Sequence, residues 1–494
     1  DDTAPAVPTD TNTDGDQQAA PSQGDETVLD LPVLESTVSD AFKVVVSNVI
    51  ASVPVVGGAL AAIINLLWPN SARDVWAEIR KEVEALIDQK IDEAVYNLIA
   101  AKLPGLNSAS KLYLNLVTGN ASGETIRTQW IATNTVYTAA ASEFMNSKYE
   151  WVLGPLFAIF SVMHVTLLRD AVLHGQKWGW PLPDWTAYVR FTLDTLTNYL
   201  AYYDKVLKNR RDALAKNEPP VGQHKTENYN YWQPFNNQSV IGFDDYRVLM
   251  LYLDPFEHPN ATPESELPFQ DVYSPAYGTA DDWDATASSW SSGGVATPWS
   301  NPPKGPREIY IEYFDYGVRV VQVRHDPGTG PLMWSDPNRR RDEYGIITKP
   351  QSGVEKKTFQ LGSLLYKYNI KGAIVRTGSI PIGVTLIMRD DSEVFLWDKK
   401  WISGGFRIRV LYEGRMLTTF NMWTLSRFYN DSLGCIIFGF SRDRGDIPLI
   451  PIRVLYAASI NELSPELKKR ITVTPDMKEE RKEFWRHIRS YGNA

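Results

Sequence analysis

Two different periods of hydrophobic residues divide this sequence. From about Ser39 to Leu253 apolar side chains recur every three or four residues, the spacing that predicts amphipathic helices. From Glu308 to Ala457 they alternate with polar residues or form short β-branched runs between turns, which predicts an all-β region. A stretch rich in Pro, Ser and Trp, residues 256–305, lies between the two and is predicted to be a linker.

The spacing in the first region predicts helices, and Asp184, which follows Pro183, is the expected N-cap of one of them. In the predicted helix 74–102, the apolar residues expected to face inward run from Trp76 to Leu98. The predicted helices cover residues 59–68, 74–102, 124–146, 151–174, 184–216 and 243–253. The predicted strands cover residues 308–314, 318–325, 366–377, 383–389, 393–399, 406–412, 416–420, 433–440 and 452–457. In the 406–412 strand, apolar residues are expected on one face and arginines on the other.

One predicted helix is apolar on every side. No charged side chain occurs from Trp151 to Leu168, and a helix of that length spans roughly 27 Å, close to the ~30 Å hydrocarbon core of a bilayer. Gly154 and Pro155 interrupt its start, and Arg169 with Asp170 continues the helical period. Such a helix, flanked by amphipathic ones, forms the centre of a bundle or a membrane span. A pore-forming protein needs one segment that serves as both.

The charge of the chain is concentrated in its first residues. The net charge is −9, and residues 1–35 contain nine acids and no Lys or Arg, so the remainder balances at 59 − 9 = 50 acids against 50 bases. Residues 1–38 are therefore expected to be a disordered acidic tail. Because the rest carries no net positive charge, we expect no nucleic-acid partner. Cys435 is the only cysteine, which excludes an intrachain disulfide.

The sequence contains no pattern typical of a catalytic site. It has no H-x-x-H or H-E-x-x-H pair, no phosphate-binding glycine loop and no G-x-S-x-G turn, and its six histidines are scattered. We therefore expect no enzyme, no metal and no cofactor. The absence of an initiating Met and of a signal-peptide pattern indicates a processed or trimmed form.

Four blocks of the helical region resemble the Bacillus crystal delta-endotoxins. Leu167-Leu168-Arg169-Asp170 followed by Gly175-Gln176-Lys177-Trp178-Gly179 is similar to the central-helix block of that family, and His164 fits the same block. The stretches 54–69, 76–87 and 245–256 resemble its first helices and its last bundle helix, in the same order. The resemblance implies a seven-helix pore-forming bundle over residues 39–255, built around the 151–174 helix.

The β region resembles the β-prism domain of that family and jacalin-type prisms. The resemblance rests on Tyr316-Gly317-Val318, on the strand 383–388 and on the loop and strand 431–436. It implies a β-prism rather than a β-sandwich, a receptor-binding domain over 306–460, and then a charged helical extension, 461–494. A third, sandwich domain is not expected, as in the larger subunit of the Photorhabdus insect-related binary toxins. Arg427 stands where the lectin pattern has Gly, so the resemblance does not imply sugar binding.

The 124–174 segment is predicted to be a helical hairpin that turns near residues 147–149 and enters the membrane. Ten apolar residues of its second helix are predicted to face lipid or neighbouring helices: Trp151, Leu153, Leu156, Phe157, Ile159, Phe160, Val162, Val165, Leu167 and Leu168. A rotation of about 100° per residue places a polar stripe on the first helix, predicted to line the pore: Glu124, Thr128, Thr135, Ser142 and Asn146. The alternative is that this stripe is the solvated face of an outer bundle helix.

Three further features have two interpretations each. His164 is either a hydrogen-bonded core residue or a pH-sensitive latch. Residues 338–342 form either a solvated loop or a protease site or contact with an anionic surface. Four residues near the expected apical loop are receptor-binding candidates or core residues: Trp423, Phe428, Tyr429 and Asp431.

Together these observations predict an insecticidal pore-forming toxin, secreted or stored in a crystal or inclusion, that acts at the plasma membrane of a target cell. Its partners would be that membrane and an unknown surface receptor or glycan, with homo-oligomers forming on insertion. The acidic tail would be dispensable or removed by proteolysis. One alternative is a lectin or adhesion protein whose bundle never opens. The other is a binary-toxin component that is inactive without a small partner subunit.

Overall fold

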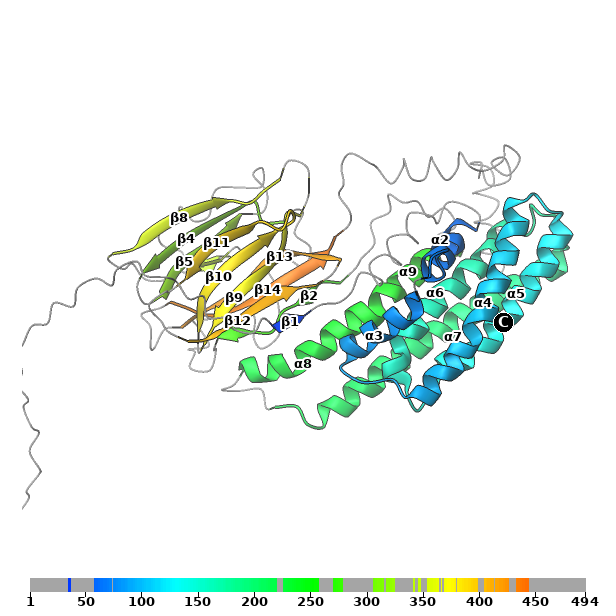
Figure 1. Cartoon of the computed structure of the whole chain (residues 1–494), viewed down its shortest axis with the longest axis horizontal. Coiled ribbons are helices and arrows are strands. Elements are labelled where there is room, and N and C mark those ends of the chain that lie inside the picture. Colours follow the sequence, from blue (N-terminus) through cyan, green and yellow to red (C-terminus); the bar gives the residue numbers. More distant parts are fainter. Residues whose placement is uncertain are drawn as a thin grey trace, which may run out of the picture.

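The computed structural model describes part of the chain, namely residues 34–36, 57–72, 74–219, 225–256, 270–278, 305–314, 317–324, 341–342, 345–347, 353–363, 366, 368–378, 380–398, 404–412, 414–425 and 432–443. In these ranges an elongated helical bundle lies beside a stack of β-sheets (Figure 1). The predicted order, helices and then strands, is confirmed. Most of the acidic tail, the strand at 452–457 and the extension 461–494 lie outside the described residues.

The described helices form seven rods, as the resemblance implies. They are α2 (Gly58–Leu67), α3 (Val75–Ile87), α4 (Glu93–Thr118), α5 (Gly123–Phe144), α6 (Glu150–His174), α7 (Leu182–Ala215) and a continuous rod made of α8 (Lys225–Ser239), the π-helix η1 (Val240–Asp244) and α9 (Asp245–Leu253). The extra residue of each π turn shifts the side chains that follow, so α8 and α9 present different faces to their neighbours.

The predicted helix 74–102 is wrong, because the chain breaks in the middle of it. Asp88 adopts a left-handed conformation with φ of 53°, which ends α3. Asp92 then caps α4, its carboxylate accepting hydrogen bonds from the backbone N–H groups of Ala94 and Val95. Since α4 starts with a new orientation, Leu98 is 51% exposed instead of facing inward.

Two other helix predictions also differ from the structure. The helix α7 begins at Leu182, with Pro181 in the N-cap position, so Asp184 lies in its first turn and forms an ion pair with Arg127 of α5. The helix α8 was not predicted, because its Asn- and Gln-rich sequence contains Pro234 and lacks a clear apolar stripe. Only its continuation near Phe243 carries the expected spacing.

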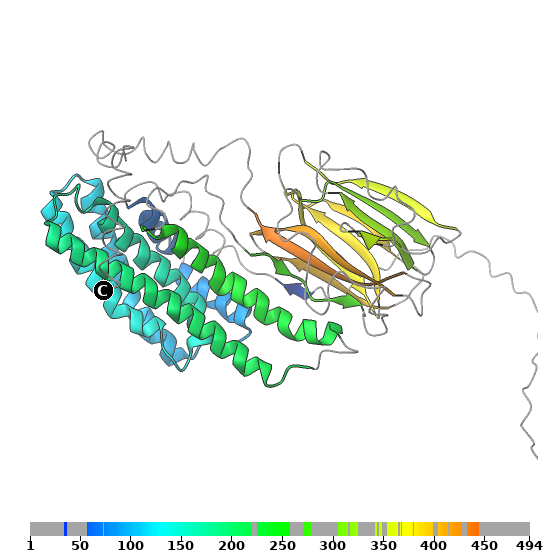
Figure 2. The ribbon, with the colours of Figure 1, turned by 180° about the vertical axis from the view of Figure 1, so that it is seen from behind.

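The helix α6 is the centre of the bundle. Every residue from Trp151 to His174 is buried, and α2, α3, α5, α7 and α9 pack around it. Gly154 is required for this packing, since a Cβ atom there would lie 2.1 Å from the ring of Phe243. Seen from behind, the bundle runs alongside the sheets at one end and extends away from them at the other (Figure 2).

Three sheets make up the described β region. The strands are β1 (Leu34–Ser36), β2 (Val272–Tyr273), β3 (Tyr277–Gly278), β4 (Glu308–Phe314), β5 (Gly317–Arg324), β6 (Arg341–Asp342), β7 (Gly345–Ile347), β8 (Glu355–Gln360), β9 (Ile370–Thr377), β10 (Pro381–Met388), β11 (Glu393–Asp398), β12 (Phe406–Leu411), β13 (Arg415–Leu425) and β14 (Ser432–Arg442). The first sheet has the order β1-β12-β9-β10-β11, the second β13-β14-β2 with β3 also pairing β14, and the third β6-β7-β5-β4-β8. All pairs are antiparallel except the parallel pair β1–β12.

The three sheets share one hydrophobic core, to which each contributes large apolar side chains such as Ile311, Leu386 and Phe438. Whether this is a prism rather than a sandwich stays a prediction. The short strands were not predicted: β1 falls in the predicted tail, β2 and β3 fall in the predicted linker, and β6 falls in the 338–342 segment. Phe406 is 66% exposed at the start of β12, so the expected apolar face is buried only further along that strand.

The rod α8–η1–α9 joins the bundle to the sheets. Asp245 at the start of α9 is buried and accepts hydrogen bonds of 2.9 Å from Arg415 of β13 and Arg442 of β14. On α8, the Tyr229 hydroxyl donates to the Ser274 carbonyl at 2.8 Å, and the Asn237 amide donates to the Tyr273 carbonyl at 2.9 Å. These polar contacts fix the rod to the β region while its apolar side covers α6.

Candidate membrane-inserting hairpin

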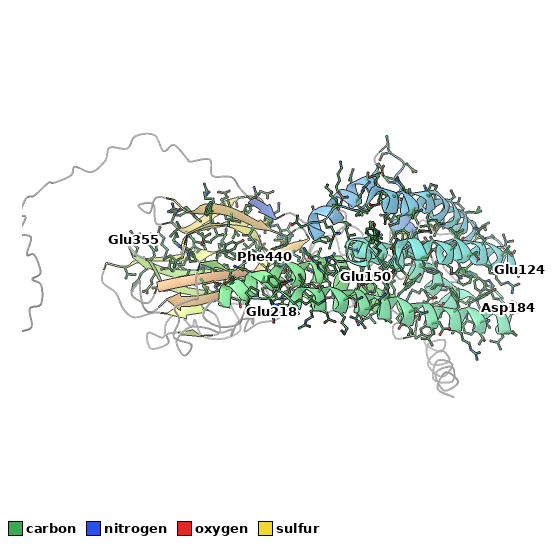
Figure 3. All side chains as sticks on the ribbon, turned by 90° about the horizontal axis from the view of Figure 1, so that it is seen from below. Glu124, Glu150, Asp184, Glu218, Glu355 and Phe440 are labelled. Atoms are coloured by element: carbon green, nitrogen blue, oxygen red, sulfur yellow. The ribbon has the colours of Figure 1, made fainter. Side chains whose placement is uncertain are left out.

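The helices α5 and α6 pack against each other and are joined by the short turn 145–149. In this turn the Asn146 side-chain oxygen accepts a hydrogen bond from the Lys148 backbone N–H at 3.1 Å. Figure 3 shows Glu124, at the start of α5, at the end of the bundle away from the sheets, and Glu150, at the start of α6, nearer to them. The chain therefore contains the hairpin that the sequence predicts.

All ten residues predicted for the inserting helix lie in the core, and none is more than 7% exposed. Among the helices in the described ranges, α6 is the one that is long and apolar enough to cross a membrane. A wholly buried core helix meets the same test, and α6 is such a helix here. The 25 residues of α6 span roughly 37 Å. The composition of α6 therefore suits both the core of a bundle and a lipid bilayer.

The predicted polar stripe lies on the outer face of α5. Four of its five residues are exposed, namely Glu124, Thr128, Thr135 and Ser142, while Asn146 follows the end of the helix and is half-buried in the turn. The opposite face, with Trp130 and Tyr137, is buried. This position is expected of a solvated outer face and also of a pore lining that water reaches only after insertion, so both predictions stay open.

Charge is absent from the middle of α5. Between Arg127 and Glu143 every side chain is uncharged, a length of roughly 22 Å. Several hydroxyls in the hairpin donate to carbonyls of their own helix: Thr135 to Ile131 at 2.9 Å, Thr138 to Asn134 at 2.8 Å, Ser161 to Ala158 at 2.8 Å and Thr166 to Met163 at 2.7 Å. Donors satisfied within one helix remain satisfied wherever that helix moves.

The two helices of the hairpin are held together by buried contacts of their own. The Trp130 indole N–H donates to the Leu167 carbonyl at 2.9 Å, and the rings of Phe144 and Phe160 stack at 4.5 Å. His164 lies 2.7 Å from the Asn134 side-chain oxygen. Since that oxygen accepts, the Nε2 of His164 carries the proton. These contacts stay intact if α5 and α6 move as one unit.

Other polar contacts tie the hairpin to the rest of the bundle. The Tyr199 hydroxyl of α7 donates to Nδ1 of His164 at 2.6 Å, and the Tyr203 hydroxyl bonds to Ser161 at 2.9 Å. Near the end of α6, the Arg169 guanidinium donates to the Leu253 carbonyl at 2.8 Å. These contacts would have to break if the hairpin left the bundle.

Two buried titratable groups on α6 shift in ways that burial explains. Burial lowers the pKa of His164 to about 3, so the ring is neutral and hydrogen-bonded on both nitrogens, as the core interpretation expects. Burial also raises the pKa of Asp170 to about 7, although hydrogen bonds from the Tyr113 hydroxyl and the Gly57 backbone lower it in part. Lowering the pH therefore destabilises the folded state through His164, whose buried ring would have to become charged, and stabilises it through Asp170, whose buried carboxylate becomes neutral.

The receptor-binding candidates are not brought together in the described part of the chain. Trp423 belongs to β13, where its backbone lies opposite Cys435 of β14. Phe428, Tyr429 and Asp431 lie outside the described residues. Their predicted role therefore stays a prediction.

Sequence reasoning missed the tyrosines that hold the hairpin in place. The sequence did not assign a hydrogen-bonding role to Tyr113, Tyr199 or Tyr203. A usable signal was present, since a tyrosine at a buried helix position needs a partner for its hydroxyl, and α6 carries polar residues at Ser161, His164 and Asp170.

Comparison with known proteins identifies relatives of the helical domain. Residues 44–254 match the family model of the delta endotoxin, N-terminal domain. The pesticidal crystal protein Cry1Ea of Bacillus thuringiensis subsp. kenyae is 26% identical over 183 residues, which are 36% of this chain and 15% of that protein. The pesticidal crystal protein Cry19Ba of subsp. higo is 27% identical over 211 residues, 40% of this chain and 29% of that protein. The chain thus aligns with only a small part of either relative.

Solved structures match over most of the chain. The insecticidal crystal protein Cry7Ca1 of Bacillus thuringiensis superposes with a TM-score of 0.56 at 17% identity, covering 82% of this chain and 75% of that one. PirB superposes with a TM-score of 0.60 at 13% identity, covering 83% of this chain and 96% of that one. The fold is therefore that of these toxins, and the resemblance to the delta-endotoxins and to the Photorhabdus insect-related toxin is confirmed.

Proposed function

We propose that this protein is an insecticidal pore-forming toxin that inserts the α5–α6 hairpin into the membrane of a target cell. One observation supports this proposal most: α6 carries no charge from Trp151 to Leu168, is buried along its whole length, and is paired with a helix whose outer face is polar but uncharged in its middle. The relatives described as pesticidal crystal proteins support the target class.

Releasing the hairpin breaks polar bonds on both of its helices, each of which contributes about 1 kcal/mol net. On α6 these include the bonds from Tyr113, Tyr199 and Tyr203, the one to the Leu253 carbonyl and the one from the Trp185 indole. On α5 they include the bonds to Ser110, to the Ala109 carbonyl and to Asp184. Lipid is as apolar as the bundle interior, so α6 loses little hydrophobic stabilisation when it exchanges one for the other. The bundle then acts as a water-soluble cover for a membrane helix.

A single hairpin cannot enclose water, because it offers only one polar face. We infer that several copies assemble with the Thr128, Thr135 and Ser142 side of α5 turned towards a common channel and α6 turned towards lipid or its neighbours. In this arrangement Glu124 and Arg127 lie at one mouth and Glu143 at the other. The β region would bind a receptor or glycan at the cell surface, with the toxin released from a secreted or crystalline store.

Dye release from large unilamellar vesicles tests the proposal. Arg127→Cys/Asp184→Cys, joined by a flexible bis-maleimide, ties α5 to α7, because these two residues form an ion pair across the helices. Lys208→Cys/Asp212→Cys is the matched control, since the same linker there stays within α7. We expect the α5–α7 link to abolish release and the control link to leave it unchanged. Equal release from both would reject insertion of this hairpin.

A second candidate function is that of a component that acts only with a smaller partner protein. The observation that favours it is the PirB structure, 96% of which is covered by this chain. It predicts no release from the chain alone and release once a second protein is added. A lectin whose bundle never opens would instead bind glycans without any release.

A further inference from the structure

A cleft of about 540 Å³ lies at the joint between the bundle and the sheets, outside the α5–α6 hairpin. Its walls come from the end of α7, the length of α8, the π-helix and the approach to β2. Glu218, one of its lining residues, lies beside the helices that adjoin the sheets (Figure 3). The volume falls within the range of pockets that hold small molecules.

The lining of this cleft has a net negative charge. Three carboxylates, those of Glu218, Asp244 and Asp271, face one guanidinium, that of Arg211. Burial raises the pKa of Asp244 to about 6, so its carboxylate is mostly ionised at neutral pH. Arg247, the nearest cation to it along the chain, lowers that pKa in part but forms its ion pair with Asp204 at 2.6 Å. The half-buried carboxylate of Asp244 thus has no hydrogen-bond donor in the described part of the chain.

Aromatic side chains form much of the remaining wall, namely Tyr229, Trp232, Phe235 and Tyr273. The Trp232 indole N–H donates to Glu218 at 2.6 Å, and the Tyr229 hydroxyl donates to the Ser274 carbonyl at 2.8 Å. These bonds fix the wall before any ligand arrives. Aromatic rings beside carboxylates are the surroundings in which an organic cation is attracted by both charge and the ring faces.

An independent observation also points to a ligand. Ser239 lines the cleft with only 8% of its surface exposed, and its hydroxyl has no hydrogen-bond partner in the described ranges. A buried hydroxyl without a partner is costly, and a ligand in the cleft would supply one. The π-helix starts at the next residue, and π turns occur frequently at functional sites.

We propose that this cleft binds a small organic cation, an ammonium group on a short hydroxylated body, with Asp244 as its counter-ion and Ser239 as a hydrogen-bond partner. The ammonium charge would pair the carboxylate that the protein leaves without a donor, whereas a neutral ligand would leave that charge unmatched. Because α8 and β2 both line the cleft, a bound cation would bridge the bundle and the β region.

Choline and its neutral isostere 3,3-dimethylbutan-1-ol, which has carbon in place of the charged nitrogen, test the proposal on the unmodified chain by saturation-transfer NMR and calorimetry. We expect choline to bind and the neutral alcohol to bind about tenfold more weakly or not at all. Equal binding of the two, or no binding of choline, would overturn the proposal. This comparison needs no variant, so it holds even if a substitution prevents folding.

Asp244→Asn should weaken choline binding by about tenfold, and Ser239→Ala should weaken it by less. The matched control is Asp212→Asn, an exposed acid of α7 outside the cleft, and it should leave the affinity unchanged. Unchanged affinity in Asp244→Asn, with circular dichroism showing a folded protein, would also overturn the proposal. The hairpin proposal does not depend on this cleft, so the vesicle assay remains a separate test.

Discussion

Removing the hydroxyl of Tyr199 tests whether the bundle restrains the hairpin through its buried polar bonds. This hydroxyl donates to Nδ1 of His164 at 2.6 Å, and the two residues are 5% and 1% exposed. Tyr199→Phe keeps the ring and its edge contact with Phe157 but leaves Nδ1 buried without a donor. An unpaired buried acceptor costs about 1–3 kcal/mol, so the free energy of unfolding should fall by that amount.

The same substitution should accelerate membrane insertion. Because this bond has to break before α6 separates from α7, its loss removes part of the barrier to release. A change of about 1.4 kcal/mol in a barrier alters a rate about tenfold. We therefore expect dye release from vesicles to be roughly tenfold faster in Tyr199→Phe, measured beside urea unfolding followed by far-ultraviolet circular dichroism.

Tyr188→Phe is the matched control. Tyr188 lies on the same helix, is half-buried and contacts the Trp130 ring at 4.8 Å, and its hydroxyl has no hydrogen-bond partner in the described ranges. Its loss should change stability by less than about 0.5 kcal/mol and leave the release rate alone. If Tyr199→Phe loses stability but releases dye at the original rate, separation of α6 from α7 does not limit insertion, and our reasoning is wrong.

Three further predictions concern stability. Gly154→Ala should lower the free energy of unfolding by about 1–3 kcal/mol in urea titrations, because its Cβ would lie 2.1 Å from the ring of Phe243, whereas Gly105→Ala, with its nearest neighbour at 3.8 Å, should not destabilise. Asp245→Asn should cost about 3–5 kcal/mol in the same assay by leaving two buried guanidinium groups without their carboxylate; a loss below 1 kcal/mol would contradict this. The pKa of Asp170 is about 7 in the folded protein, above its unfolded value, so its contribution to the free energy of unfolding is complete below about pH 4 and is lost as the pH rises to 7. Relative to Asp170→Asn, the free energy of unfolding of the natural chain should therefore rise by about 2 kcal/mol from pH 7 to pH 5. A fall over the same pH range would refute the assignment.

Much of the fold follows from local pattern. The helices α5, α6 and α7 begin and end close to their predicted limits because their apolar spacing is long and regular. The break between α3 and α4 was missed because the apolar residues continue across it, and only the left-handed Asp88 and the cap at Asp92 separate the helices. The strands β1, β2 and β3 were missed because each is two or three residues long and is defined by its partner, β12 or β14.

Some features of the candidate hairpin could also be predicted from local sequence pattern, and others could not. The hairpin could be predicted, since a run of residues without charge and an amphipathic neighbour are local features. The partners of its polar residues could not be predicted, because Tyr199 meets His164 only after α7 has packed on α6 at a particular rotation. The cleft at the joint is further out of reach, as Ser239 and Asp271 come from segments that only tertiary packing brings together.

The sequence of α6 cannot say where the helix resides, because a bundle core and a lipid bilayer select the same composition. The groups packed around α6 determine which of these two environments it occupies. In the folded chain the polar groups of α6 bond to their own helix, to Asn134 of α5, to the Leu253 carbonyl or to tyrosine hydroxyls of the neighbouring helices. Since each such tyrosine bond adds only about 1 kcal/mol, the surrounding helices hold α6 in water chiefly by covering its apolar surface. A bilayer would cover that apolar surface equally well, as the proposed insertion of α6 requires.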